Sequence, residues 1–258
     1  MGVLNVTPDS FSDGGDYSDR DRALAHALAM VAEGADIIDI GGESTRPGAA
    51  EVGTEEELRR TIPVVEALAA RSPALISIDT SKPEVARAAL AAGAHIVNDV
   101  TGLRDPAMRQ AVADFQAGAC VMHMRGTPRT MQDAPRYTDV VAEVRAYFEA
   151  QLAACAESGI ALEQIALDPG IGFGKTLDHN LALLRHLPDL RAGGRPLLLG
   201  ISRKSFIGKL LGDERLASRE WPTAALSAWL RLRGAEIHRV HDARRNAEAV
   251  RMAEATLP

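Results

Sequence analysis

Short aliphatic segments recur along the chain, and most are followed by a longer stretch with helical spacing. Eight such segments lie at residues 3–6, 36–40, 75–79, 95–98, 119–123, 165–168, 197–201 and 236–240. Segments of four or five residues that are rich in Ile, Val or Leu have the length and composition of buried strands. The stretches with helical spacing include residues 23–33, 55–70, 83–92, 140–157 and 224–233. This alternation predicts a parallel sheet covered by helices.

Glycines mark several of the expected boundaries between helix and strand. Each follows an expected helix and precedes an expected strand, where a helix C-cap favours glycine; they are Gly34, Gly93, Gly118 and Gly234. Eight strand–helix units in 258 residues fit a closed (β/α)8 TIM barrel better than an open doubly wound sheet. No Gly/Ser-rich linker or change of composition divides the chain, so residues 1–258 are expected to form one domain.

The composition excludes several classes of protein. A hydrophobic content of 46% excludes a disordered chain, and a net charge of -6 argues against a dedicated nucleic-acid binder. No apolar run approaches the roughly 20 residues that cross a bilayer, and the N-terminus lacks a signal-peptide pattern. Cys120 and Cys155 form no CxxC pair, which favours a reducing compartment. We therefore expect a cytoplasmic protein without nucleic-acid or membrane partners.

Polar residues stand at the carboxyl ends of the expected strands. In chain order they are Asn5, Asp39, Asp79, Asn98, His123, Asp168, Ser202 and His241. Any one of them could simply cap a helix or form an Asx turn. Eight together indicate the catalytic face of a barrel, because all eight βα loops converge there.

Two familiar motifs are excluded by their spacing. Residues 170–176 (GIGFGKT) resemble a phosphate loop, but Gly170 and Gly174 are separated by three residues instead of four. The same glycines do not meet the dinucleotide-binding spacing, so a nicotinamide cofactor is not expected. His238 and His241 are three apart on an expected strand and therefore point to opposite faces, which argues against a shared metal.

Basic residues near the last two strands predict an anion site. Arg239 and His241 share one face at the end of the last strand, although Arg239 could instead pair with Asp242 at the surface. The segment at residues 202–205 (SRKS) leads into a helix that is expected to start near Ser205. Backbone N–H groups there, with Lys204, could hold a carboxylate or phosphate oxygen. The alternative is that Ser205 is an ordinary helix cap, which could hold at the same time.

Acidic and amide side chains predict a second kind of binding at the same face. Asp79, Asn98 and Asp168 could bind a metal or a ligand rich in N–H donors. A carboxylate forms two parallel hydrogen bonds with a guanidine-like edge, as it does with arginine. Because Lys204 is expected nearby, a polar heterocycle is favoured over a metal.

Six motifs give the chain a resemblance to the dihydropteroate synthase family, in order and over essentially its whole length. They are NVTPDSFSDGG (5–15), GGESTRPGA (41–49), IDTSKPEVARAALAAGAHIVNDVTG (78–102), LDPGIGFGKT (167–176), GISRKSFIG (200–208) and RVHD (239–242). The resemblance implies a barrel enzyme of folate biosynthesis. Such an enzyme condenses 6-hydroxymethyl-7,8-dihydropterin diphosphate with 4-aminobenzoate, with Mg²⁺, and releases 7,8-dihydropteroate and diphosphate.

The resemblance also implies a division of the site into three parts. The pterin pocket falls on Asp79, Asn98, Asp168 and Lys204, with Asp39 and Met122 as supporting residues. The diphosphate site falls on Asn5, Arg239 and His241, with Asn5 as the Mg²⁺ contact. The 4-aminobenzoate site, where sulfonamides compete in the family, falls on Phe11, Thr45, Arg46, Pro47, Phe173 and Ser205.

The chemistry of the substrate implies a dissociative displacement. The leaving diphosphate sits on a CH₂ group attached to an electron-rich dihydropterin, so the carbon–oxygen bond can break early and leave a delocalised cation. No covalent nucleophile is required, which agrees with the lack of a Cys–His or Ser–His–Asp pattern. The catalytic roles fall on Asp13, Arg46, Lys204, Arg239 and His241, and the loops of Asp13 and Arg46 would exclude water from the cation.

Two alternative functions share the barrel. One is a pterin-binding homologue without synthase activity, and the other is a pterin-dependent methyltransferase domain. Both predict loss of the STRPG loop, the SRKS turn or the basic residues, and all of these are present.

Two features differ from the family pattern. Family members usually carry a segment upstream of the first motif that forms a hairpin under the barrel, so the barrel floor is expected to be incomplete or closed differently here. Trp221 and Trp229 are eight residues apart and could share a helix face, either packed in the core or at the homodimer interface that the family implies.

Overall fold

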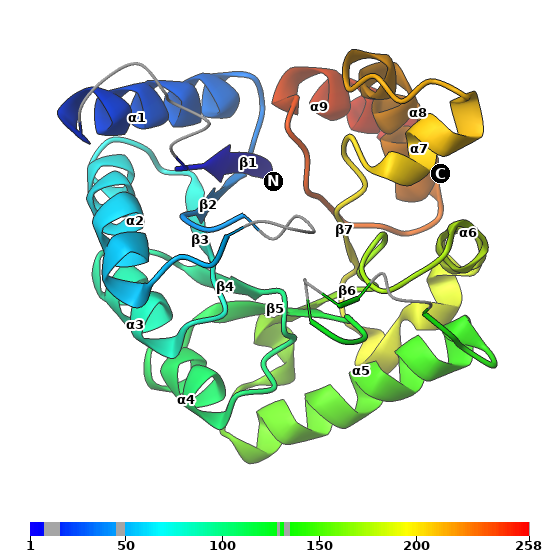
Figure 1. Ribbon diagram of the computed structural model, residues 1–258, viewed down its shortest axis with the longest axis horizontal. Coiled ribbons are helices and arrows are strands. Elements are labelled where there is room, and N and C mark those ends of the chain that lie inside the picture. Colours follow the sequence, from blue (N-terminus) through cyan, green and yellow to red (C-terminus); the bar gives the residue numbers. More distant parts are fainter. Residues whose placement is uncertain (8–15, 45–49, 128–129, 132–134, 258) are drawn as a thin grey trace.

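A computed structural model describes residues 1–7, 16–44, 50–127, 130–131 and 135–257. Within these residues, parallel strands alternate with helices around a ring (Figure 1). The strands are β1 (Gly2–Asn5), β2 (Ile37–Gly41), β3 (Leu75–Asp79), β4 (Ile96–Asp99), β5 (Gly118–Met122), β6 (Ile165–Asp168), β7 (Leu198–Leu199) and β8 (Ile237–His238).

Helices follow the strands and form the outer layer (Figure 1). They are α1 (Asp16–Ala32), α2 (Thr54–Ala69), α3 (Pro83–Ala91), α4 (Pro106–Asp114), α5 (Val140–Glu157), α6 (Leu177–Arg185), α7 (Ser205–Leu211), α8 (Glu220–Leu232) and α9 (Ala243–Glu254). Short 3₁₀ segments occur at Leu162–Gln164, Leu187–Leu190, Ala192–Gly194 and Ala217–Arg219.

The order of the strands confirms the (β/α)8 barrel. Strands β1 to β6 pair with their neighbours in chain order, and β7 pairs with β8, all in parallel. Isolated parallel bridges join the two sheets, from Leu167 to Leu197 on one side and from Gly2 to Val240 on the other. The ring is therefore closed, and the carboxyl ends of the strands face one side of the molecule.

The elements form where side-chain chemistry supports them. Helix α5 begins after Asp139, whose carboxylate accepts hydrogen bonds from the backbone N–H groups of Val141 and Ala142 at 3.0 and 3.1 Å. Its inner face buries Phe148 and Leu152 among the strands and neighbouring helices. Strands such as β2, buried on both faces, read as continuous aliphatic segments because helices cover one face and the barrel interior covers the other.

Three details differ from the expectations. The expected strands at 197–201 and 236–240 shorten to the two-residue strands β7 and β8, because only single bridges continue their pairing. Gly118 does not follow a helix end but is the first residue of β5, and the left-handed residue after α4 is Gln116, at φ 51°. Gly34, Gly93 and Gly234 do have the expected left-handed backbone after their helices.

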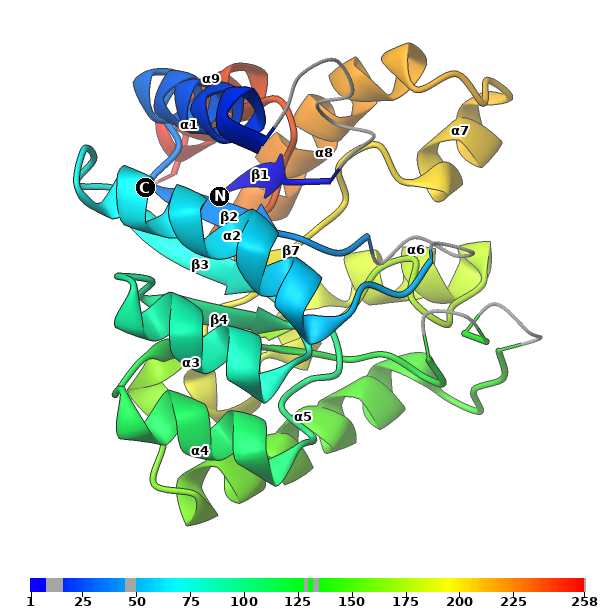
Figure 2. The same ribbon diagram turned by 60° about the vertical axis from the view of Figure 1, so that its left-hand side comes forward.

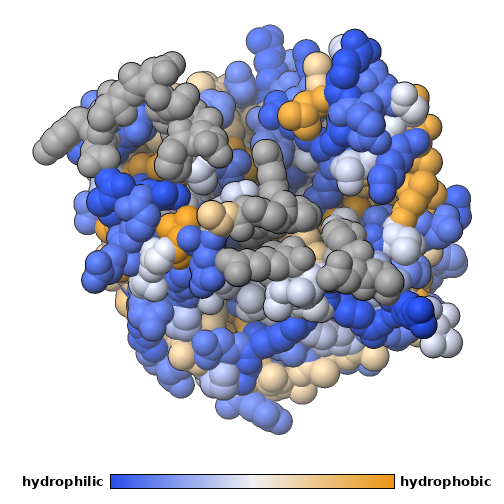
Figure 3. Space-filling model, viewed as in Figure 1, coloured by the Kyte–Doolittle hydropathy of each residue, from blue (hydrophilic) through white to orange (hydrophobic). Residues whose placement is uncertain are grey.

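The remaining features concern the outer surface. In the described part of the chain, no helix is long and apolar enough to cross a membrane. Trp221 and Trp229 are 73% and 39% exposed, so the alternative of core packing is wrong for both. Exposed apolar side chains appear at the upper right of Figure 3, over the region of α7 and α8.

Candidate active site

A cavity of about 1150 Å³ opens at the carboxyl ends of the strands. In Figure 2 the arrows of β3 and β4 point toward the side of the molecule where α6 and α7 lie. Seven of the residues that were given a role in substrate binding or catalysis line this cavity: Asn5, Asp79, Phe173, Lys204, Ser205, Arg239 and His241. The convergence of strand ends has therefore brought both the predicted anion site and part of the predicted heterocycle site into one space.

The other predicted residues fall into two groups. Four are buried: Asp39, Asn98, Met122 and Asp168. Met122 belongs to a small apolar cluster against which Phe173 packs, and the contacts of the other three are described below. Five lie outside the described residues: Phe11, Asp13, Thr45, Arg46 and Pro47. The roles of this second group stay predictions from the resemblance.

Arg239 connects three strands at the centre of the cavity. Its Nε donates to Asp39 Oδ2 at 2.5 Å, and its Nη2 donates to Asp79 Oδ2 at 2.6 Å. Asn98 also donates to Asp39 Oδ2, at 3.1 Å. The alternative of a surface pair between Arg239 and Asp242 is wrong. Asp242 instead caps α9 by accepting a hydrogen bond from the backbone N–H of Arg245.

This network holds two buried carboxylates against one guanidinium. Asp39 is 0% exposed, Asp79 is 8% exposed, and Asp39 Oδ1 has no hydrogen-bond partner within the described residues. Burial raises the pKa of Asp79 to about 7, because Arg239 offsets only part of the lost hydration and Asp39 adds a like charge. Burial lowers the pKa of Arg239, but the neighbouring charges of Asp39 and Asp79 outweigh burial and raise it. The network thus holds two carboxylates and one guanidinium, which leaves a surplus of hydrogen-bond acceptors. Such a surplus suits a ligand that brings N–H donors.

Asp168, at the end of β6, is the third carboxylate of this region. It is 6% exposed, and its Oδ1 accepts the backbone N–H of Gly170 at 2.7 Å. Burial raises the pKa of Asp168, while the ammonium of Lys204 is the largest influence that opposes the shift. The charges of Asp168 and Lys204 therefore influence each other across this end of the barrel.

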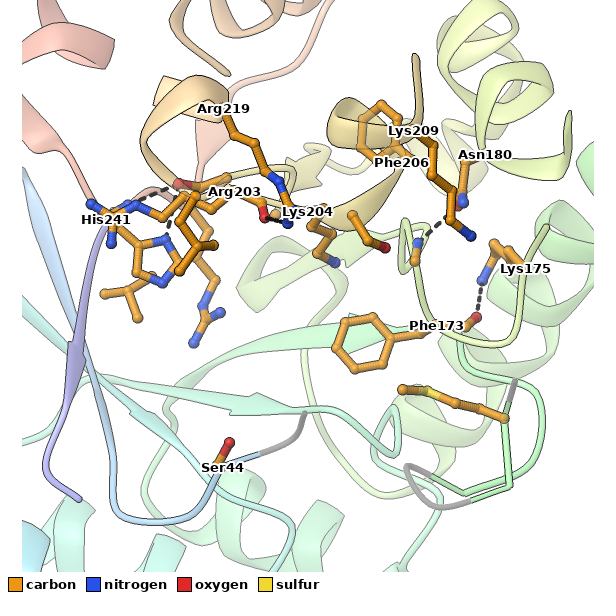
Figure 4. Close-up of a pocket in the computed structure, with 18 of the residues that line it drawn as sticks. Ser44, Phe173, Lys175, Asn180, Arg203, Lys204, Phe206, Lys209, Arg219 and His241 are labelled. Carbon is orange, nitrogen blue, oxygen red and sulfur yellow. Dashed lines mark hydrogen bonds between the residues drawn. The ribbon is translucent and has the colours of Figure 1, made fainter. Parts of the chain in front are cut away.

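Lys204 comes from the loop between β7 and α7 and points toward Phe173 (Figure 4). Its Nζ lies 4.4 Å from the centre of the Phe173 ring and donates to the carbonyl oxygen of Ile171. Burial lowers the pKa of Lys204 to about 8. The cap position of α7 is Lys204 and makes no side-chain cap hydrogen bond, so the alternative of Ser205 as an ordinary cap is wrong.

His241 lies at the opposite side of the cavity (Figure 4). Its backbone N–H donates to Ser202 Oγ at 3.2 Å, and its Nδ1 lies 3.0 Å from the same hydroxyl. Ser202 follows β7 and His241 follows β8, so their contact joins the last two strand ends. This contact fixes the orientation of the imidazole beside Arg239.

Two residues near the cavity were given no binding or catalytic role in the sequence interpretation. Lys175 lines the cavity from the loop after β6, and its Nζ contacts His123 Nδ1 at 3.0 Å. His123 was recognised only as a strand end, and Lys175 only as part of a failed phosphate-loop pattern. The glycine-rich motif at residues 170–176 was the signal that could have identified Lys175. The spacing of its glycines, however, does not show that its carbonyl groups bind this lysine.

The charge on the cavity wall is mixed, with an excess of cations among the described residues. The basic lining residues are Lys175, Arg203, Lys204, Lys209, Arg219 and Arg239, and the acidic ones are Glu43 and Asp79. The whole chain contains four lysines, and three of them belong to this wall. A ligand with anionic ends and a donor-rich centre matches this arrangement.

The residues present are compatible with a magnesium ion that is held largely by substrate. The described residues contain no group of three or more His, Cys, Asp or Glu side chains that could hold a metal alone. Asn5, at the end of β1, lines the cavity and offers one amide oxygen. Mg²⁺ commonly takes one or two protein oxygens and completes its shell with phosphate and water. The donor set therefore fits Mg²⁺ bound together with a diphosphate.

The chain is similar over nearly its whole length to proteins of one family. A model of the pterin binding enzyme family matches residues 1–241. Dihydropteroate synthase of Escherichia coli strain K12 is 53% identical over 100% of this chain and 91% of its own length. A Yersinia pestis dihydropteroate synthase solved with a sulfonamide drug is 48% identical, with a TM-score of 0.93 over 99% of this chain and 93% of that one. A Xanthomonas albilineans dihydropteroate synthase solved with 4-aminobenzoic acid is 48% identical, with a TM-score of 0.92 over 100% and 93%.

Proposed function

This chain belongs to the dihydropteroate synthases of the pterin-binding enzyme family, and we propose that its barrel mouth holds the two substrates of that reaction side by side. The reaction joins 6-hydroxymethyl-7,8-dihydropterin diphosphate to 4-aminobenzoate and releases diphosphate. The observation that supports this placement is the cavity itself, where buried carboxylates at the strand ends meet a cationic wall. Each part of that surface suits a different part of the substrates.

The pterin ring binds at the carboxylates. Asp79 and Asp168 are the acceptors for its donor-rich edge, and Asn98 supplies an amide beside them. A guanidine-like edge can make two parallel hydrogen bonds with one carboxylate. In this structure the Arg239 guanidinium already contacts these acids, with one hydrogen bond to Asp39 and one to Asp79. Lys204 donates to a ring carbonyl or nitrogen from the opposite side, and Met122 with Asp39 supports the pocket from behind.

The diphosphate binds at Arg239, His241 and Asn5. These side chains line the same cavity from β8 and β1, which are neighbours through the bridge between Gly2 and Val240. Asn5 would hold Mg²⁺, which when bound neutralises charge on the diphosphate. Arg239 and His241 stabilise the oxygen atoms on which negative charge develops as the carbon–oxygen bond breaks.

The 4-aminobenzoate binds at Phe173 and Ser205. Phe173 presents its ring to the cavity, and Ser205 is at the start of α7 on the same wall. The carboxylate of 4-aminobenzoate meets Ser205, so the amine of this substrate faces the carbon that loses diphosphate. Phe11, Thr45, Arg46 and Pro47 complete this subsite by resemblance.

The mechanism is a dissociative displacement carried by binding and charge stabilisation. The carbon–oxygen bond breaks with its electron pair leaving on diphosphate, and the amine nitrogen then forms the new bond to carbon. The nitrogen loses one proton to the departing diphosphate, whose oxygens are strong acceptors. Asp79 and Asp168 hold the cationic ring and favour its positive charge. Asp13 and Arg46 keep their proposed role in excluding water from this cation.

The wider setting of the protein is also a proposal. A homodimer is supported by the exposed apolar side chains Leu210, Leu211, Trp221 and Trp229 on α7 and α8. A cytoplasmic location is supported by Cys120 and Cys155, which are both unpaired.

An Asp168→Asn variant tests the pterin subsite. Loss of this carboxylate should lower kcat/KM for the dihydropterin diphosphate about a hundredfold, since a charged, paired contact is lost. The measurement is diphosphate release with and without 4-aminobenzoate, and with Mg²⁺ omitted in a third arm, where we expect the rate to collapse. Asp178→Ala, in the first turn of α6, is the control and should keep full activity. Turnover of Asp168→Asn within a factor of a few would show that Asp168 does not anchor the pterin.

A further inference from the structure

Lys175 places its ammonium inside the loop that carries Phe173. The side chain is 3% exposed, and its Nζ has four acceptors within hydrogen-bond distance. These acceptors are Phe173 O at 2.9 Å, Gly170 O at 3.0 Å, His123 Nδ1 at 3.0 Å and His123 O at 3.2 Å. All four are neutral groups, so the ammonium is held by dipoles and not by a direct salt bridge.

The backbone of this loop is shaped around the ammonium. Gly170, Gly172 and Gly174 have φ values of 64°, 83° and 62°, in the left-handed region. A Cβ atom at Gly170 would lie 2.0 Å from His123 O, so only glycine allows the loop to approach the end of β5 this closely. A phosphate loop directs its N–H groups inward, whereas this loop directs the carbonyl groups of Gly170 and Phe173 toward its own lysine.

The same loop forms the wall of the 4-aminobenzoate subsite. Phe173 O accepts from Lys175, while the Phe173 ring lies 4.4 Å from Lys204 Nζ (Figure 4). Lys204 also donates to the carbonyl oxygen of Ile171, in the middle of the loop. On its other side, Lys175 contacts His123, whose backbone N–H donates to Asp168 O at 2.9 Å. One ammonium therefore connects the strand ends that hold the pterin acceptor to the loop that holds the aromatic ring.

We propose that Lys175 is a positioning residue that holds the loop after β6 so that the Phe173 ring is set for 4-aminobenzoate. This role rests on the proposed function, because it requires Phe173 to contact that substrate. Lys175 acts through the loop and needs no contact with the substrate. Its loss should weaken binding of 4-aminobenzoate while the diphosphate subsite on β1 and β8 keeps its geometry.

The charge of Lys175 makes this role dependent on pH. Burial lowers the pKa of its ammonium to about 7; Asp168 opposes this shift, and Lys204 and Arg125 add to it. The facing imidazole of His123 remains neutral above pH 5, because burial lowers its pKa to about 3. As the pH rises through about 7, Lys175 loses its proton and its charge, so the loop is held less firmly. The KM for 4-aminobenzoate should therefore rise between pH 6 and pH 9.

Lys175→Met tests the proposal by a split between two kinetic constants. At pH 6.5 the KM for 4-aminobenzoate should rise about tenfold, while kcat and the KM for the dihydropterin diphosphate stay within about twofold. A purely structural role would reduce the folded fraction, which lowers the apparent kcat and leaves both KM values unchanged. Arg244→Met, which removes an exposed cation on α9, is the matched control. Unchanged or equally raised KM values in folded Lys175→Met would overturn the proposal.

A second comparison applies even where Lys175→Met does not fold. The KM for 4-aminobenzoate is measured from pH 6 to pH 9 in the wild type and in Lys175→Arg, whose guanidinium stays charged throughout. We expect the rise in the wild type and a flatter profile in Lys175→Arg. A flat wild-type profile overturns the proposal, and so does an equal rise in both proteins, which would assign the titration to Lys204, whose pKa is about 8.

Phe173→Ala separates this inference from the proposed function. If Phe173→Ala leaves the KM for 4-aminobenzoate unchanged, the proposed aminobenzoate subsite is wrong, and the role of Lys175 fails with it. If Phe173→Ala raises this KM and Lys175→Met does not, the subsite stands and only the role of Lys175 is wrong.

Discussion

Arg239 is the only guanidinium that the described residues place between the carboxylates of Asp39 and Asp79. Its two short hydrogen bonds neutralise one of the two negative charges at the centre of the barrel mouth. A buried ion pair that loses one partner leaves the other charge uncompensated in a medium of low polarity. The stability of this site should therefore depend both on Arg239 and on the protonation of Asp79.

An Arg239→Met variant should lose stability in a manner that depends on pH. Without Arg239, the pKa of Asp79 rises further above its unfolded value, so the folded state binds more protons than the unfolded state as pH increases. The free energy of unfolding should fall by about 3 kcal/mol at pH 8 and by less at pH 5, where Asp79 is protonated. Urea unfolding at both pH values measures this difference. Arg87→Met, at the exposed pair with Asp114, should have a small effect that is equal at both.

The sequence predicted which polar residues would meet at the barrel mouth, because strand ends in a parallel barrel share one side. It did not predict their pairing. Arg239 was expected to face an anion, and in the ligand-free structure it contacts Asp39 and Asp79 from strands two and three. Side chains of this length choose among several partners within reach, and the choice depends on packing that a linear pattern does not contain.

The loop between β6 and α6 requires glycine at position 170 for two reasons, its backbone conformation and the lack of space for a Cβ atom. Gly170 has a left-handed backbone and would also place a Cβ atom 2.0 Å from His123 O. Gly159, between α5 and β6, has φ 83° and no atom within 4 Å of such a Cβ. A side chain at either position would have to adopt an unfavourable left-handed backbone. Only at Gly170 would its Cβ atom also collide with another atom, His123 O.

Gly170→Ala should therefore be the more damaging of a matched pair. Gly159→Ala should cost about 1 kcal/mol of unfolding free energy, which is the penalty of a left-handed residue with a Cβ. Gly170→Ala should cost more and should also raise the KM for 4-aminobenzoate, because the displaced loop carries Phe173. Urea unfolding and steady-state kinetics test both parts. Equal stability losses in the two variants, or an unchanged KM in Gly170→Ala, would contradict this account of the loop.

Strands and long helices were predictable because burial imposes a clear period on their residues. Helix α5 was expected at residues 140–157 and occupies Val140–Glu157. The shortened β7 and β8 were not predictable from the same signal, because their aliphatic residues are buried whether or not regular pairing continues. The left-handed residue after α4 is Gln116 and not, as was expected, Gly118. Which residue takes this conformation likewise depends on where the helix ends in space.

Across the whole molecule, the buried imidazole of His238 makes the free energy of unfolding sensitive to acid. His238 is 7% exposed, and within the described residues both its ring nitrogens are without a hydrogen-bond partner. Burial lowers the pKa of His238 to about 4. The unfolded chain takes up this proton near pH 6.5 and the folded chain only near pH 4, so stability falls as the pH drops through that window.

His238→Leu should remove a large part of this acid sensitivity. The wild type should lose about 2 kcal/mol between pH 7.5 and pH 5 from His238 alone, because only the unfolded state is protonated there. The leucine variant does not titrate, so its unfolding free energy should change less over the same interval. His186→Leu, at an exposed pair with Asp189, should keep the wild-type pH dependence. Parallel pH profiles for His238→Leu and the wild type would exclude His238 as a source of acid sensitivity.

The scarcity of lysine gives the molecule an uneven chemistry. Three of its four lysine side chains line one cavity, while arginine supplies nearly all the remaining positive charge. Burial brings the pKa values of Lys175 and Lys204 to about 7 and about 8, so both amines are partly uncharged near neutral pH. An amine-directed acylating reagent would consequently act as a footprint of active-site occupancy. Coupling the protein to a support through Lys209, the exposed lysine of this wall, would attach it at its own entrance, so an immobilised form that is to remain open to substrate needs a different point of attachment.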